Sequence, residues 1–186
     1  MITFGKLFRC GGIVTGASLL LPASALAATA TVTGTLSGSN LSLSTTAAPS
    51  FSDNLDLGDQ TPTYTVPATA QDSRGNGSGW NLTITSTQFS TGGATPNTLA
   101  TNASSLTGVT SACITGTCTN PTNAITYPVA VPAGATAPTA VKFFNAAAAT
   151  GMGKFTITPT IGAFVPGNSF AGTYTSTLTL AIVSGP

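Results

Sequence analysis

Apolar and polar side chains alternate with a period of two along several short stretches of this chain. In the clearest stretch, residues 80–89, Trp80, Leu82 and Ile84 share one face, and asparagine or threonine side chains occupy the other. The longest stretch runs from Tyr174 to Val183 and follows the same rule. A period of two is typical of a β-strand with one buried face, so both stretches predict strands.

Shorter segments with the same character predict further strands. They are residues 29–36, 41–43, 61–69, 125–131, 140–144 and 155–158, the last leading into Ile161. Evidence for helices is weak: residues 145–149 predict one turn, and residues 97–106 another irregular turn. Many short strands separated by clusters of Gly, Pro, Asn and Ser point to an all-β fold, an antiparallel β-sandwich of the immunoglobulin-like kind.

The composition is unusual for a soluble domain. Charged residues make up 5% of the chain, against about 25% in ordinary domains. A disordered low-complexity chain is the alternative, but such chains combine low hydrophobicity with high net charge. This chain is 41% hydrophobic with a net charge of +1, which favours a folded, Thr/Ser-rich β protein. Threonine suits an exposed pleated surface because it is branched at Cβ.

The N-terminus has the pattern of a signal peptide. Lys6 and Arg9 precede an uncharged stretch, Gly11 to Leu21, and Ala25-Leu26-Ala27 is an A-x-A cleavage signal. A retained membrane anchor is the alternative, although the apolar stretch is short for a bilayer span. We therefore predict a signal helix in residues 1–27, a single secreted domain in residues 28–186, and no stable membrane span after cleavage.

Two cysteines, Cys113 and Cys118, lie in the predicted exported domain. Export favours a disulfide between them, closing a tight turn through Thr115-Gly116-Thr117. The small loop limits its stabilisation to the low end of about 0–5 kcal/mol. A metal site is the alternative, but two thiols without any histidine are a poor ligand set.

The residues that usually carry catalysis are scarce. The chain has no histidine, and its four acidic residues are all aspartates. A serine or threonine nucleophile needs a base. Histidine is absent, and Lys142 and Lys154 lie in strand-like segments, so we predict no enzymatic activity and no cofactor. No basic stripe exists, so nucleic acid is not an expected partner. Asp53, Asp56 and Asp59 could form a calcium loop, but aspartate is also a common turn residue.

Trp80 is the only tryptophan, and it follows a glycine-rich turn at residues 75–79. Its ring could stack on a sugar and its N–H group could donate to a hydroxyl; alternatively it packs in the core, as its alternation with Leu82 and Ile84 indicates.

Asp72 and Arg74 flank the turn. They could bind a ligand or instead pin the turn through charge-assisted hydrogen bonds to the backbone.

Three ordered blocks between about Phe51 and Pro186 resemble the WxL-domain family of Gram-positive cell-surface proteins. They are Asp72-Ser73-Arg74-Gly75 with Gly79-Trp80-Asn81-Leu82-Thr83, then Phe144-Asn145-Ala146-Ala147 with Gly151-Met152-Gly153, and last Gly172 to Leu180 with Ser184-Gly185-Pro186. The resemblance implies a secreted β domain held non-covalently on the cell wall through peptidoglycan or another wall polymer, and association with other surface proteins. Such domains usually carry a second W-x-L in the terminal strand, where this chain has Leu180-Ala181-Ile182.

We therefore expect a ligand-binding surface that combines the glycine-rich turn with the terminal strand. Its residues are Trp80, Leu82, Asp72, Arg74, Tyr174, Leu178 and Leu180. Trp80 is expected to be partly buried, with one ring edge reaching solvent beside Tyr174 and Leu180. The predicted function is attachment to the cell wall; the alternative is a structural subunit of a surface layer or fibre that assembles through β-strand edges.

Overall fold

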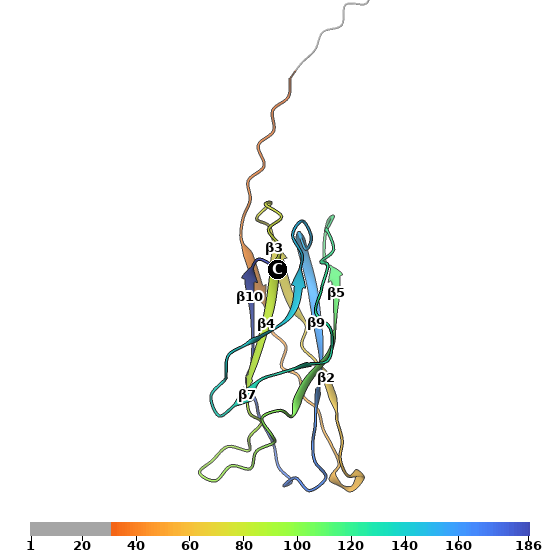
Figure 1. Cartoon of the computed structure of the whole chain (residues 1–186), viewed down its shortest axis with the longest axis vertical. Helices are drawn as coiled ribbons and strands as arrows, with labels where there is room; N and C mark the ends of the chain where they lie inside the picture. Colours follow the sequence, from red (N-terminus) through yellow and green to blue (C-terminus); the bar gives the residue numbers. More distant parts are fainter. Residues whose placement is uncertain (1–30) are drawn as a thin grey trace, which may run out of the picture. The chain divides into compact units, whose positions relative to one another are not determined.

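The computed structural model describes residues 31–186 (Figure 1). The signal helix predicted for residues 1–27 lies outside the described residues. The chain divides into two units, Met1–Thr35 and Leu36–Pro186. Residues 31–35 form no strand, and every strand that the structure describes belongs to the second unit. Over its described part, the strand predicted at residues 29–36 is therefore wrong.

One sheet of the second unit has six strands. They are β1 (Leu41–Ser44), β2 (Thr63–Thr65), β3 (Ala68–Asp72), β5 (Ser104–Cys113), β6 (Val129–Ala130) and β9 (Gly153–Ala163). Their order is β1-β3-β9-β5-β6, and β2 pairs with β9 beyond the end of β3. All these pairs are antiparallel.

The other sheet has four strands: β4 (Trp80–Thr87), β7 (Ala133–Gly134), β8 (Val141–Ala146) and β10 (Leu178–Ser184). Strand β4 is central, with β10 on one side and β7 and β8 on the other. The short β4–β7 pair is parallel, and the other two pairs are antiparallel. Within residues 31–186, one turn of 3-10 helix, η1 (Leu55–Leu57), is the only helical element, and no helix is long and apolar enough to cross a membrane.

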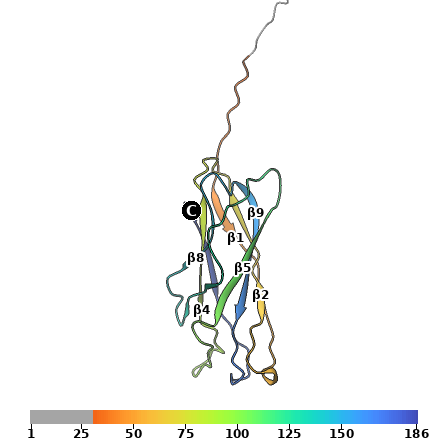
Figure 2. The same cartoon turned by 45° about the vertical axis from the view of Figure 1, so that its right-hand side comes forward.

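The two sheets pack face to face (Figures 1 and 2). One main cluster of buried apolar side chains lies between them. Strand β4 buries Trp80, Leu82 and Ile84 to 1% exposure or less, as its alternation predicted. The opposite sheet contributes Phe155, Ile157 and Ile161 from β9. The predicted all-β, mostly antiparallel sandwich is thus confirmed.

Several other segments differ from the sequence-based expectation. The strand predicted at residues 125–131 is reduced to β6, and β10 begins at Leu178 rather than at Tyr174. Strand β5 occupies Ser104–Cys113, where an irregular turn was predicted up to residue 106. Its register shifts between Leu106 and Gly108, and its second half is mostly exposed, so no apolar period marks it. Residues 145–149 form no helix, because Asn145 and Ala146 complete β8.

Candidate functional site

Parts of the three family-like blocks meet at one end of the sandwich. This motif end consists of residues 72–83, 144–153 and 184–186. Strand pairing brings it together, because Trp80 lies opposite Ala146 on one side and opposite Ser184 on the other. The remaining piece of the third block, Gly172 to Leu180, lies along the start of β10 and the loop before it.

Trp80 is the centre of the motif end. Its Nε1 donates a hydrogen bond to the carbonyl oxygen of Gly151 at 2.9 Å, and its ring lies 5.8 Å from that of Phe144. Gly151 has φ +71°, and an added Cβ would lie only 2.6 Å from Nε1. A side chain at this position would displace the indole, so only glycine allows this contact.

The expected exposure of Trp80 is wrong. The side chain is 1% exposed, so no ring edge reaches solvent. The expected neighbours are wrong too, because Leu180 pairs with Ile84, and the bridge from Thr175 to Ser90 places Tyr174 beyond the far end of β4. Trp80 is therefore a core residue, and Leu82, also 1% exposed, packs in the same core.

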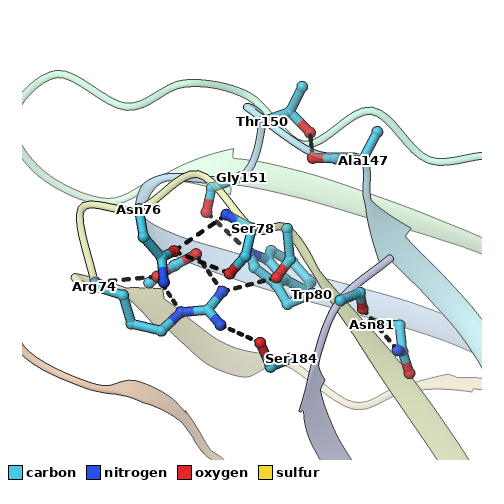
Figure 3. A network of polar contacts seen from close by, with 12 residues as sticks. Arg74, Asn76, Ser78, Trp80, Asn81, Ala147, Thr150, Gly151 and Ser184 are labelled. Carbon is cyan, nitrogen blue, oxygen red and sulfur yellow. Dashed lines mark hydrogen bonds and ion pairs between the residues drawn. The ribbon is translucent and has the colours of Figure 1, made fainter.

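Asp72 and Arg74 form an ion pair at the same end, and Figure 3 shows Arg74 with its contact to Ser184. Arg74 Nε and Nη2 donate to the two carboxylate oxygens of Asp72 at 2.9 and 2.8 Å. Nη2 also donates to the carbonyl oxygen of Gly79 at 2.7 Å, and Nη1 donates to Ser184 Oγ. The bidentate bonds from Arg74 hold the pKa of Asp72 below its ordinary value, despite the opposing effect of burial. The pair thus pins the turn at residues 75–79 to the terminal strand.

The chain terminus completes the motif end. Gly185 N donates to the Gly79 carbonyl at 3.1 Å, and Asn81 Nδ2 donates to the Gly185 carbonyl at 2.8 Å. Lys142 Nζ reaches the carbonyl of Pro186 at 2.9 Å. These polar groups form hydrogen bonds with one another, so the motif end closes this end of the sandwich.

A groove of about 990 Å³ opens elsewhere, along the free edges of the two sheets. Residues 43–55, from the end of β1 onward, form one wall, and residues 169–180, leading into β10, form the other. Tyr64, Val66, Phe89, Leu99 and Val165 line it as well. Strand β1 pairs only with β3, and β10 only with β4, so each is an edge strand within the described chain.

The groove has an aromatic end and an aliphatic part. The aromatic end is formed by Phe51, Tyr64, Phe89, Phe170 and Tyr174. Phe51 stacks on Tyr64 at 5.8 Å and meets Phe89 edge-on at 5.7 Å. Burial raises the pKa of the Tyr64 phenol. The Tyr174 hydroxyl donates to the Phe170 carbonyl at 2.9 Å, and the Phe170 side chain is 70% exposed.

The aliphatic part lies nearer the middle of the sandwich and is lined by Leu43, Val66, Leu178 and Leu180. The predicted binding residues are therefore divided between two places. Tyr174, Leu178 and Leu180 line the groove, whereas Trp80, Leu82, Asp72 and Arg74 belong to the motif end.

Sequence reasoning missed Phe51, Phe89 and Phe170 as groove residues. Phe51 and Phe170 stand in irregular segments rich in Ser, Asn and Gly, and Phe89 follows the end of β4. Phe51 and Phe170 belong to no alternating strand pattern, and Phe89 is the last residue of the strand predicted at residues 80–89, which gave no sign of a groove. An isolated aromatic residue in a polar, irregular segment, as at Phe51 and Phe170, is the sequence feature that could have indicated a binding surface.

The remaining candidates have local structural roles. Cys113 and Cys118 are joined as predicted, linking the end of β5 to the loop that follows. Asp59 accepts a hydrogen bond from Gly167 N at 2.8 Å, and Asp53 accepts one from Asn54 N at 2.8 Å. Asn54 in turn caps η1. Within residues 31–186, no three His, Cys, Asp or Glu side chains are grouped in a way that could hold a metal ion.

Comparison with protein families gives a match that spans the described chain. Residues 31–186 match the family described as WxL domain, surface cell wall-binding. Comparisons with curated proteins and with solved structures found no match. The match begins before β1 and runs to the last residue, so it includes both the motif end and the groove. The chain belongs to the WxL family of cell-wall-binding surface domains.

Proposed function

We propose that this domain is exported and attaches non-covalently to the peptidoglycan of the cell wall through the aromatic end of the groove. The observation that carries the proposal is the exposed Phe170 beside Tyr174, at the mouth of a groove built on stacked aromatic rings. Sugar rings have apolar faces that pack on aromatic side chains, and their hydroxyls bond to polar groups around them.

The rest of the groove suits a largely uncharged polymer. Its lining includes many serine and threonine side chains, and Asp53 is its only charged residue. Hydroxyl groups can both donate and accept hydrogen bonds, so they match the hydroxyls and amides of a glycan. Leu178 and Leu180 continue the lining from Tyr174 into the aliphatic part.

The motif end supports this surface from a distance. Trp80 and Leu82 fill the core beneath β10, while Asp72 and Arg74 tie the end of β10 to the turn at residues 75–79. These four residues thus stabilise the position of β10, the strand that contains Leu178 and Leu180. The proposal assigns them no direct contact with the polymer and involves no enzymatic step or cofactor.

The test is co-sedimentation of the exported protein with purified peptidoglycan. Phe170→Ala should weaken binding about tenfold or more while leaving the melting temperature unchanged, because an exposed ring contributes little to folding. Phe164→Ala is the matched control: Phe164 is also an exposed phenylalanine, at 41%, but it does not line the groove. N-terminal sequencing of the same protein tests export, with Ala28 expected as the first residue.

Equal binding by both variants and the unchanged protein would contradict the aromatic end as the contact surface. Failure of the unchanged protein to sediment would contradict peptidoglycan as the ligand. Binding to walls that still carry their other polymers, with none to purified peptidoglycan, would assign the site to one of those polymers.

A further inference from the structure

The sandwich is incompletely sealed where its two edge strands face each other. Inward-facing side chains of β4 and β9, such as Leu82 and Ile157, are 1% exposed or less. In contrast, Leu43 on β1 and Leu178 and Leu180 on β10 pack against the same core and stay only half-buried. An added strand at this edge would bury their exposed surface and pair with unpaired backbone groups.

The chain itself contains a segment with the pattern of such a strand. In residues 31–36, Val32, Gly34 and Leu36 alternate with three threonines. The segment forms no strand, and Val32 and Leu36 are 92% and 96% exposed. These are the most exposed large apolar side chains in the described chain. This segment therefore has the alternating, β-branched pattern of a strand, but its apolar side chains are exposed to water. Such a segment can bury them by pairing with a sheet edge.

We propose that residues 31–36 of one copy of this protein insert as a strand into the aliphatic part of the groove of a second copy. Val32 and Leu36 then enter the groove lined by Leu43, Leu178 and Leu180, and the threonines face solvent. Neither surface opposes this by charge, since residues 31–36 carry none and Asp53 is the only charged residue of the groove lining. Repetition of this head-to-tail contact builds a chain of copies.

The geometry of the entry to β1 favours a second copy over the same chain. Ser39 N already donates to the Ser73 carbonyl at 2.8 Å, and Ser73 N to the Asn40 carbonyl at 3.2 Å. Only Ser37 and Gly38 remain to reverse the chain. Two-residue hairpin turns need positive φ angles, and Gly38 is not among the glycines with positive φ. An added Cβ on Gly38 would lie 2.3 Å from the Arg74 carbonyl oxygen, so the backbone here is closely packed.

The experiment measures the mass of the exported protein in solution by light scattering over a range of concentrations. The unchanged protein should form oligomers that grow with concentration. Val32→Asp with Leu36→Asp should reduce the association constant about tenfold or more for each side chain. Thr33→Asp with Thr35→Asp is the matched control, with the same added charge on the solvent-facing side, and should still assemble.

Mixing gives a second, directional test. A groove variant, Leu180→Asp, keeps its donor segment, while the Val32→Asp/Leu36→Asp variant keeps its groove. Each should be monomeric alone, and the mixture should stop at a heterodimer. Amide hydrogen exchange supplies a readout that needs no groove variant: residues 31–36 should be protected in the oligomer and unprotected in the monomer.

Three outcomes would overturn the proposal. They are a monomeric unchanged protein at every concentration, undiminished assembly of the Val32→Asp/Leu36→Asp variant, and protection of residues 31–36 within a monomer, which would mean that the chain fills its own groove. The experiment contains no wall material, so its failure leaves the proposed attachment to peptidoglycan untouched.

Discussion

Trp80 stabilises the motif end in two ways, by filling the core and by donating its N–H group. Trp80→Ala should lower the free energy of unfolding by about 3–5 kcal/mol, because a large buried side chain is lost. Trp80→Phe keeps most of the packing but leaves the Gly151 carbonyl without its donor, and should cost about 1–3 kcal/mol. Denaturant unfolding measures both. An unchanged stability with lost wall binding would instead make Trp80 a contact residue.

Asp72 makes the stability of the domain sensitive to acid. Its pKa in the folded protein is lowered, chiefly by the hydrogen bonds from Arg74. A lowered folded-state pKa contributes stability above the unfolded-state pKa, and this contribution is lost as the pH falls through the folded-state value. Unfolding free energy measured from neutral pH downward should therefore decrease below about pH 4.

Asp72→Asn should be less stable than the unchanged protein at neutral pH and should show a shallower decrease in acid. Asp56→Asn is the control, since Asp56 is exposed on η1. Parallel pH profiles for the Asp72→Asn variant and the unchanged protein would refute the role of the ion pair.

At the scale of elements, the sequence predicted strands well where one face is continuously buried. Strand β4 satisfies this condition and was placed to within two residues, as its burial pattern explains. Strand β5 was missed because its register shifts after Leu106 and only Val109 still packs against the core beyond that point, so most of its second half needs no apolar side chains. Residues 145–149 were given a helical turn from their alanines, but Ala146 is buried opposite Trp80 and belongs to β8.

The groove could not be predicted in the same way, because it depends on which edges face each other. Tyr174, Leu178 and Leu180 were identified from the terminal strand alone. Their partners Phe51 and Leu43 come from a segment more than a hundred residues earlier, and only the fold brings them together. Trp80 was misplaced for a related reason, since the register of β10 decides which of its residues lie beside the indole.

The disulfide at the end of β5 closes a short loop, so it should matter little for the stability of the whole sandwich. Cys113 and Cys118 should resist alkylation in the exported protein until a reductant is added. Reduction should then lower the melting temperature only slightly, because the constraint on the unfolded chain is small. Intact-mass analysis checks the first statement and thermal unfolding the second. Two alkylated thiols without reductant would contradict the pairing in the exported protein.

At the scale of the whole molecule, the low charge separates two kinds of wall ligand. The described chain carries Arg74, Lys142 and Lys154 against four aspartates, and the groove lining holds only Asp53. Attachment through aromatic rings and hydroxyl groups depends little on ionic strength, whereas attraction to a strongly anionic wall polymer is screened within about 10 Å at 0.1 M salt.

Co-sedimentation with purified peptidoglycan should thus be almost the same at low and high salt. It should fall when Phe170→Ala removes the exposed ring, and a denaturant should release the protein because no covalent bond holds it. Release by salt alone would show that charge carries the attachment, and would move the wall contact away from the groove to a surface that carries a lysine, Lys142 on β8 or Lys154 on β9.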